Sequence, residues 1–492
     1  MLQVMVSVNQ VPTSARASIA DTNGTPSIVA LTDVILFTFL TAYLGWSLVY
    51  AANEAPSSIA IQIVLSFNGI LGLVGLRRSL LRGYPLFVVF FLFSFLFHSL
   101  APLQQIAERK SPIFHETDVL LLASALCIPF TLFGLFLVFR RRPKSSTAHR
   151  QAGLLNSSLL RFQGRDTTLL LVVTGATTTA LLLYYLPVLF TNRQAASSAL
   201  SSDASKTALI FLHAFVDPFA FVGAFVGLLV SIRSSDHGRA FLFGAITLLA
   251  AVVNNPLIHA RYQSSALIVF ALLAIYGWNR TRLILYTIIA GISVSPIFNS
   301  LFRYNSVSND TRRLENFFAH MDYDALNIFC YTIIWVRERG IEYGNNLFGA
   351  LLFFIPRSLW NEKGQHPAQI IFGYLKEYEG YTIDNLSSPP PVEGYLAFGV
   401  MGALALPLVV AMTFDAIERR AALAQPFSPW QLIVCMLVMM AMIFLRGPLQ
   451  VGFAEAVMRC LTILATTYLL YAGAVMKPRH RAHVRKARRT QF

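Results

Sequence analysis

Apolar segments about as long as a bilayer is thick recur along most of the chain. An α-helix needs roughly 20 apolar residues to cross the hydrocarbon core of a membrane. Twelve segments come close to this length, at 28–51, 58–76, 84–102, 118–139, 167–190, 207–231, 239–254, 264–279, 283–301, 394–414, 428–445 and 453–475. The pattern therefore predicts an all-α, polytopic helical membrane protein with about 12 transmembrane helices.

One polar connection between the predicted spans, residues 302–393, is far longer than the others. Connections of this length are either functional or disordered, and the aromatic content here favours a folded, functional loop. Two apolar stretches in it, Tyr323–Val336 and Leu347–Trp360, are too short to span a bilayer. They predict short helices that lie in the membrane interface. Ser387–Pro391 predicts a stiff, extended connector.

The pattern thus divides the chain into five regions. A flexible leader (1–27) precedes predicted transmembrane helices 1–9 (28–301), the long connection (302–393), helices 10–12 (394–475) and a basic tail (476–492).

The charge distribution predicts how the chain is oriented in the membrane. Only 13% of the residues are charged and 55% are hydrophobic, which excludes an ordinary soluble domain. The net charge of +15 comes from clusters in alternate connections and in the tail. Of the 39 Lys and Arg residues, 24 fall on one side of the predicted membrane, which marks that side as cytoplasmic and makes a nucleic-acid partner unnecessary. Both termini are then predicted in the cytoplasm and the long connection outside, which in a bacterium is the periplasm.

Basic residues are also concentrated in the long connection, although the positive-inside rule disfavours them there. They are Arg303, Arg312, Arg313, Arg337, Arg339, Arg357, Lys363 and Lys376. Attraction to an anionic ligand explains this concentration, and pairing with the acids of the same connection explains it equally well.

The stretch Pro356-Arg357-Ser358-Leu359-Trp360, with Lys363 six residues after Arg357, is the first candidate binding site. An arginine binds phosphate through two hydrogen bonds, a lysine adds a point charge, and a tryptophan offers a face on which a sugar stacks. Membrane anchoring by a snorkelling Arg/Lys pair and an interfacial tryptophan is the alternative.

Glu393 is the candidate general base, because it lies at the start of the tenth predicted span between three prolines and Gly394-Tyr395. In a partly apolar site its pKa would rise into a useful range. An exposed carboxylate stabilised by the helix dipole is the alternative. Arg446, in the turn between the last two spans, and Arg303, at the start of the long connection, could converge with Arg357 on one anion or anchor lipid headgroups.

The histidines predicted on or near the outer side are His98, His115, His259, His320 and His366. None has metal-ligand spacing, and no phosphate-binding glycine loop occurs, so neither a metal nor a cofactor is predicted. His320 and His366 are the reserve candidates for the base.

Taken together, the long connection, the Ile-Pro-Arg-x-Leu-Trp-x-x-Lys stretch ending at Lys363 and the Gly-Tyr-Leu-x-Phe-Gly-x-x-Gly stretch starting at Gly394 resemble the Wzy-type oligosaccharide repeat-unit polymerases. These are the O-antigen and exopolysaccharide polymerases of bacterial inner membranes. The general topology is similar over nearly the whole chain, whereas the motifs lie in 320–402. Lys363 is followed by glycine where members commonly have proline, and Ala397 stands where they tend to have asparagine.

The resemblance implies a GT-C-like, metal-independent glycosyltransferase that moves a growing glycan from undecaprenyl pyrophosphate to the non-reducing end of a lipid-linked repeat unit. Implied partners are the lipid-linked oligosaccharide, membrane lipid, a chain-length regulator and a flippase. The implied site combines Glu393, with His320 or His366 in reserve, and a binding set of Arg357, Lys363, Arg303, Arg446, Trp360 and Tyr395. An O-antigen ligase shares donor and topology. A transporter or flippase would need charges inside the spans, and Arg459 is the main one there.

Overall fold

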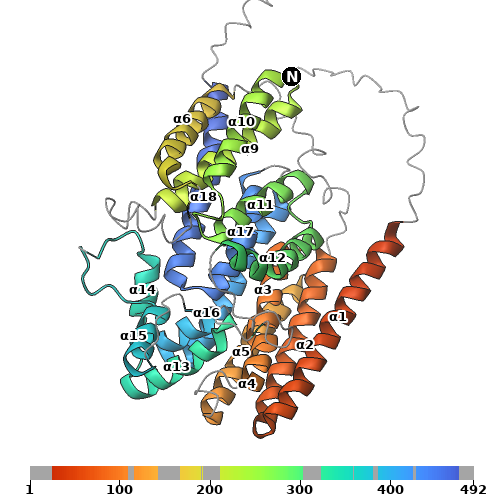
Figure 1. Ribbon diagram of the computed structural model, residues 1–492, viewed down its shortest axis with the longest axis vertical. Coiled ribbons are helices and arrows are strands. Elements are labelled where there is room, and N and C mark those ends of the chain that lie inside the picture. The colour runs from red at the N-terminus through yellow and green to blue at the C-terminus, as the bar shows by residue number, and fades with distance from the viewer. Residues whose placement is uncertain are drawn as a thin grey trace, which may run out of the picture. The chain divides into compact units, whose positions relative to one another are not determined.

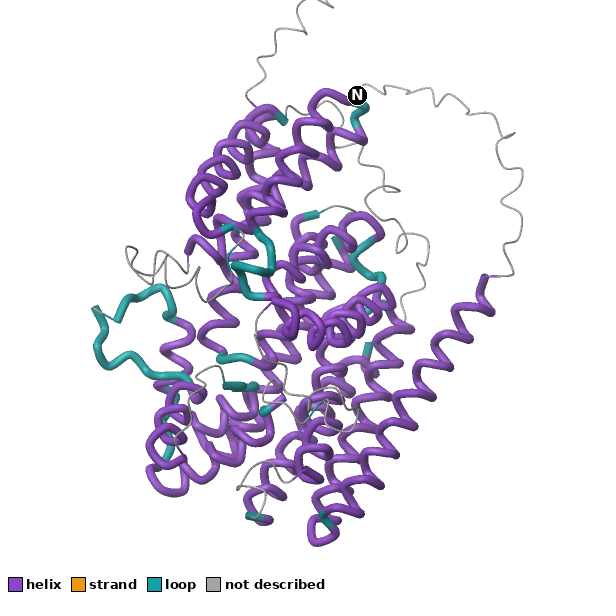
Figure 2. The backbone as a smooth tube through the Cα atoms, in the orientation of Figure 1, coloured by secondary structure: helices purple, strands orange, loops and turns teal. Residues whose placement is uncertain are grey.

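The computed structural model describes residues 25–108, 116–141, 167–189, 191, 211–302, 318, 323–357, 359–379, 386–424 and 428–475. Helices account for nearly all of these residues, and no strand occurs among them (Figure 2). Most of the predicted leader, the basic tail and the residues Arg303, His115 and His320 lie outside the described residues.

Most helices follow one another with short connections, except between α5 and α6, between η6 and η7, and around the long connection (Figure 1). They are α1 (Thr25–Glu54), α2 (Ile59–Arg82), α3 (Pro85–Phe95), α4 (Ala101–Glu108), α5 (Thr117–Arg140), α6 (Thr168–Tyr185), α9 (Asp217–Arg233), α10 (His237–Val253), α11 (Arg261–Tyr276), α12 (Thr281–Phe302), α13 (Ala325–Arg339), α14 (Asn345–Leu351), α15 (Pro367–Glu379), α16 (Pro390–Leu423), α17 (Pro429–Arg446) and α18 (Leu449–Val475). Short turns of other helix types are η2 (Pro56–Ser58), η3 (Leu96–Leu100), η6 (Leu186–Val188) and η7 (Leu212–Val216). The chain divides into two compact units, with the boundary in the sequence between Trp46 and Ser47, and the site lies in the second unit.

The protein is a polytopic helical membrane protein. Among the described residues, nine helical segments are long and apolar enough to cross a bilayer. Three shorter apolar helices lie within α10, α11 and α12. Each of the twelve predicted apolar segments falls on a helix, which confirms the predicted class of protein. The number of helices that cross the membrane stays a prediction.

Helix α3 lies at the centre of the second unit because it is apolar on every side. All of its residues are buried, and it packs against α2, α5 and α17. The rings of Phe90 and Phe130 stack with their centroids 4.2 Å apart. A helix that is hydrophobic all round belongs in such an interior position.

A buried network of ion pairs and hydrogen bonds connects α16 to the end of α5 and to the start of α3. Arg141, at the end of α5, contacts the carboxylates of both Asp415 and Glu418, the latter at 2.9 Å. Glu418 also accepts a hydrogen bond of 2.7 Å from the backbone N–H of Leu86, at the start of α3. Arg141 therefore has a structural role in addition to the topological role predicted from its charge.

The long connection folds into three helices, α13, α14 and α15. α13 corresponds to the first short helix that the sequence predicts, Tyr323–Val336. The second, predicted over Leu347–Trp360, is helical only up to Leu351, where α14 ends, and α15 was missed. α13 and α15 pack against each other and against α16, while α14 packs against α16 and α18 (Figure 1). Pro389 is extended, as predicted, but the predicted connector Ser387–Pro391 ends early, because Pro390 and Pro391 form the start of α16.

Helix α16 is broken five residues after Glu393. Phe398 and Gly399 have non-helical backbone angles, and Gly399 has φ +63°, which favours glycine. A side chain on Gly402 would overlap the carbonyl oxygen of Gly394, so these two glycines permit a close approach of the backbone across the break. The break therefore explains why the sequence motif contains glycine at these three positions.

Candidate functional site

A polar pocket of about 560 Å³ lies among α13, α14, α15 and the loop between α14 and α15. Its volume falls in the range of about 300–1,000 Å³ typical of small-ligand sites. It is lined by Trp335, Arg339, Glu342, Asn345, Arg357, Asn361, Glu362, Lys363, Gly364, Gln365, Gln369, Ile370, Gly373, Tyr374 and Glu377. The lining is unusual because carboxylates, guanidinium groups, amides and aromatic rings all occur in it.

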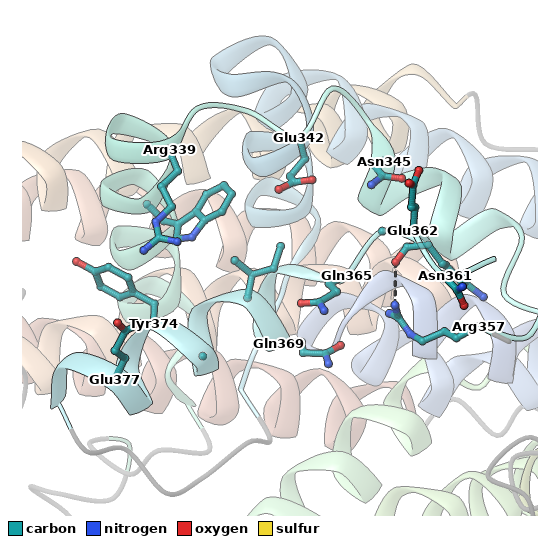
Figure 3. A pocket seen from close by; sticks show the side chains of 15 residues that line it. Arg339, Glu342, Asn345, Arg357, Asn361, Glu362, Gln365, Gln369, Tyr374 and Glu377 are labelled. Atoms are coloured by element: carbon teal, nitrogen blue, oxygen red, sulfur yellow. Dashed lines mark hydrogen bonds between the residues drawn. The ribbon is translucent and has the colours of Figure 1, made fainter.

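Figure 3 shows that the charged side chains lie towards two ends of the pocket. Arg339 lies near Tyr374 and Glu377 at one end, and Arg357 lies near Glu362 at the other. Amide side chains and Glu342 occupy the space between the ends. The arrangement offers hydrogen-bond donors and acceptors along its length, with positive charge available at each end.

The broken helix α16 holds one wall of this pocket. The backbone N–H of Glu342 donates a 2.9 Å hydrogen bond to the carbonyl oxygen of Leu396, which lies just before the break. Gly344 lies against the ring of Phe398, where a side chain on the glycine would clash. The glycine motif thus positions the segment that carries Glu342 and Asn345.

Lys363 lines the pocket, but its ammonium group is engaged in holding the loop. The side chain is 4% exposed. Its Nζ donates to the carbonyl oxygens of Leu352, Phe353 and Ile355 at 3.1, 3.0 and 2.9 Å, directly after α14 ends. Burial and, to a smaller degree, the Arg357 guanidinium lower the pKa of Lys363. Its predicted role in binding phosphate stays a prediction, and the geometry assigns it a capping role.

Arg357 is exposed and lines the pocket, as a ligand-binding arginine should. One guanidinium nitrogen donates 2.8 Å to the carbonyl oxygen of Lys363 (Figure 3), which holds the arginine at the loop. A guanidinium has five N–H donors, so this bond leaves further donors for an anionic or hydroxyl-bearing ligand.

His366 caps α15 rather than facing the pocket. Its Nδ1 accepts a hydrogen bond of 3.2 Å from the backbone N–H of Gln369, in the first turn of the helix. Burial, and then the charge of Arg357, lowers the pKa of His366 to about 4. The ring is therefore neutral at pH 7 and a weak base.

Glu393 lies where the sequence predicts, in the first turn of α16, but it is 1% exposed. Its Oε1 accepts hydrogen bonds from Ser388 Oγ at 3.1 Å and from the Leu449 N–H at 2.9 Å. Its Oε2 accepts a bond of 3.0 Å from Asn346 Nδ2. Three donors from three segments hold this carboxylate, so it joins the starts of α14, α16 and α18.

The remaining predicted residues are dispersed. Tyr395 is 7% exposed and packs edge to face with Phe329 of α13. Arg446 ends α17, and its carbonyl oxygen accepts a 2.7 Å bond from the Ser388 N–H, near Glu393. Neither these two residues nor Trp360 belongs to the described lining of the pocket. Of the nine predicted site residues, the pocket brings together Arg357 and Lys363.

The residues that sequence reasoning missed come mainly from α13 and α15. Gln369, Gly373 and Glu377 are four residues apart and therefore share one face of α15. The four-residue spacing could have predicted this shared face, but only once Pro367–Glu379 was recognised as a helix.

A second polar group could hold a metal ion. Ligand atoms of His213, Asp217 and His259 all lie within 4.8 Å of one another. The histidines singled out in the sequence have no metal-ligand spacing. His213, however, precedes Asp217 by four residues, so both side chains can share one helix face.

In comparisons with known proteins, no family model matches the sequence, and no curated protein or solved structure is significantly similar to it.

Proposed function

We propose that this membrane protein is a glycosyltransferase that acts on a lipid-pyrophosphate-linked oligosaccharide. The supporting observation is the lining of the pocket between α13 and α15, where Trp335 and Tyr374 accompany four amides and three carboxylates. Aromatic faces and planar polar groups are the usual means of holding sugar rings and their hydroxyls. A pocket of this chemistry next to membrane-spanning helices suits a glycan carried on a lipid.

The proposed reaction lengthens a polysaccharide, as the resemblance to Wzy-type polymerases implies. The bond between the anomeric carbon of the growing glycan and the lipid pyrophosphate breaks, and a new glycosidic bond forms to a hydroxyl of the incoming repeat unit. The pyrophosphate leaves with the electron pair, and a base accepts the proton of the hydroxyl. The protein's part is to orient two sugars and to stabilise the charge that develops on the leaving group.

Within this proposal, Arg339 and Arg357 stabilise charge at the two ends of the pocket. Glu342 becomes a candidate base beside the predicted Glu393, because it lines the pocket and its backbone is fixed to α16. Glu393 keeps its three hydrogen-bond donors and supports the pocket wall through Asn346. A polymerase of the GT-C-like type, with the long connection in the periplasm of a bacterium, is the specific form of the proposal.

The test uses matched pairs of substitutions in a strain that lacks the chromosomal copy. We expect Glu342→Gln and Arg339→Gln each to lower polymer formation by about a hundredfold, the usual cost of removing a group that acts in the transition state. The neighbours Glu338 and Arg337 are exposed and do not belong to the described lining. Their glutamine variants are therefore the controls and should retain wild-type polymer. Equal polymer in all four variants would remove the pocket from the reaction.

The lipid-linked material in the deletion strain separates the alternatives. Single repeat units on the lipid carrier support a polymerase, whereas long lipid-linked chains support a ligase. Lipid-linked units confined to the cytoplasmic leaflet would instead support a flippase.

A further inference from the structure

A group of buried ionisable side chains lies away from the pocket, where α6, α9 and α18 pack together (Figure 1). It contains Tyr185 at the end of α6, His213 in η7, Asp217 at the start of α9 and His259 before α11. Ionisable residues inside a membrane bundle are costly and usually functional. His213 also lies in a π-helical turn, a feature frequent at functional sites.

The contacts in this group centre on one carboxylate oxygen. Asp217 Oδ2 lies 3.0 Å from His213 Nδ1, 3.8 Å from His259 Nε2 and 2.9 Å from the hydroxyl of Tyr185. The side chains of Asp217 and His259 are 2% and 3% exposed, whereas that of His213 is 30% exposed. Two of the three side chains are thus buried, and the third is partly exposed.

We infer that His213, Asp217 and His259 form a binding site for a divalent transition-metal ion of the Zn²⁺ type. Two imidazoles and one carboxylate are a common donor set for such ions, and tetrahedral Zn²⁺ uses three protein ligands with a fourth position open. The distances of 3.0 and 3.8 Å between ligand atoms bracket the spacing expected when each atom lies about 2.0–2.2 Å from a shared ion. Tyr185, which donates to Asp217, would orient the carboxylate from outside the coordination shell.

Buried oxygens without hydrogen-bond partners give an independent reason to place a cation here. Among the described residues, neither Asp217 Oδ1 nor Glu455 Oε2 has a partner. Glu455 lies on α18 and is within electrostatic reach of His213. The free oxygen of an ionised Asp217 can only accept, so a cation bound by this carboxylate would compensate it, and Glu455 adds negative charge to the surroundings.

The local charge favours a cation over an anion. Arg459 is fully buried and within electrostatic reach of both Asp217 and Glu455. One guanidinium against two carboxylates leaves an excess negative charge when the histidines are neutral, the form in which they bind metal. None of the three guanidinium nitrogens has a hydrogen-bond partner in the described part of the chain.

Metal binding requires one adjustment of His259. Its Nε2 lies 3.1 Å from the carbonyl oxygen of Val253 as well as near Asp217. To bind the ion, Nε2 must give up that contact and carry no proton. The ion would then link η7, α9 and the segment before α11.

The experiment measures metal content and is independent of any enzymatic activity. The full chain is purified in detergent with a tag that contains no histidine, stripped with a chelator, dialysed against equimolar Zn²⁺ and analysed by mass spectrometry. We expect one Zn²⁺ per chain in the wild type, and X-ray absorption should show N and O ligands at about 2.0–2.2 Å. His213→Gln, Asp217→Asn and His259→Gln should each lose the ion.

Two further variants separate a built site from adventitious binding. His237 is exposed at the start of α10, so His237→Gln should retain the full metal content. Tyr185→Phe should keep the stoichiometry but weaken Zn²⁺ affinity by about 10–100-fold, because the orienting hydroxyl is lost. A wild type that retains no Zn²⁺, or one whose Zn²⁺ is lost only in His237→Gln, would overturn the inference.

Discussion

Glu393 illustrates how a buried carboxylate can serve as an anchor, a base or both. Its three donors come from Ser388, Asn346 and Leu449. Removing the carboxylate leaves the Ser388 hydroxyl and the Leu449 N–H without this acceptor, at about 1–3 kcal/mol for each unsatisfied group. Asn346 Nδ2 still donates to the carbonyl oxygen of residue 393. We therefore expect Glu393→Ala to lower the free energy of unfolding by about 2–4 kcal/mol, measured by thermal or denaturant unfolding in detergent.

The matched variants are Ser388→Ala and Glu393→Gln. Ser388→Ala removes one donor and should cost about 1 kcal/mol. Glu393→Gln keeps the shape but places an amide NH₂ among donors, so it should also destabilise. Wild-type stability in Glu393→Gln, together with complete loss of polymer, would identify Glu393 as a base rather than an anchor.

His366 gives the loop between α14 and α15 a pH dependence of defined sign. Its pKa is lowered to about 4 in the folded protein by burial and by Arg357, whereas an unfolded histidine titrates near about 6.5. As the pH falls from about 6.5 to 4, the unfolded state takes up the proton first, so stability falls over this window and is unaffected above it. We expect a loss of about 1–2 kcal/mol, allowing for solvent screening at this partly exposed ring.

The comparison for this prediction is His366→Asn. Asparagine retains a side-chain oxygen that can cap α15 but does not titrate. Unfolding temperatures measured from pH 7.5 to 4 should therefore decline less steeply in the variant than in the wild type. Parallel declines would show that another group carries the pH dependence.

At the scale of the elements, the break in α16 links the glycine motif to the pocket. The carbonyl of Leu396 is available to the Glu342 N–H because the helix is interrupted after it. We expect Gly402→Ala to destabilise the protein by about 1–3 kcal/mol, the usual cost of overpacking, because its side chain would overlap the Gly394 carbonyl. It should also weaken glycan binding by displacing Glu342.

Gly373 provides the control, since it lies in α15, lines the same pocket and has nothing near the position of an added side chain. Gly373→Ala should be neutral or stabilise α15 by up to about 1 kcal/mol, because alanine favours helix. Thermal unfolding of both variants side by side makes the comparison. A stable Gly402→Ala would show that α16 adapts to the extra methyl group without difficulty.

The elements also show where sequence reasoning succeeded and where it stopped. Every predicted apolar segment is a helix because length and hydrophobicity are local properties. The helix α15 was missed because its sequence is half polar, and its helical face becomes apparent only when Pro367 is taken as a start. The role of Lys363 was not predictable, because its three carbonyl partners depend on how the chain turns after α14. The electrostatic interaction of Arg459 with Asp217 joins segments more than 200 residues apart, which no local sequence pattern predicts.

At the scale of the whole molecule, the number of membrane crossings before the long connection decides which side of the membrane the pocket faces. Six long apolar helical segments precede it, followed by the shorter apolar helices in α10, α11 and α12. α10 has 17 residues and α11 has 16, so each is about 24–26 Å long, slightly less than a hydrocarbon core of about 30 Å. If all three cross, nine crossings place the pocket opposite the N-terminus. If none crosses, six crossings place it on the same side.

Cysteine labelling decides between these topologies. Glu362 is exposed in the loop that lines the pocket, and Arg77 is exposed near the end of α2. The assay uses bacterial cells whose outer membrane has been opened and whose inner membrane is intact. We expect Glu362→Cys to react there with a membrane-impermeant maleimide, and Arg77→Cys to react only after the inner membrane is permeabilised. The native cysteines supply a low background, because Cys127, Cys330 and Cys435 are buried. If both positions react only after permeabilisation, an even number of α10, α11 and α12 cross. The pocket would then face the cytoplasm, where the proposed lipid-pyrophosphate reaction on the outer face could not occur.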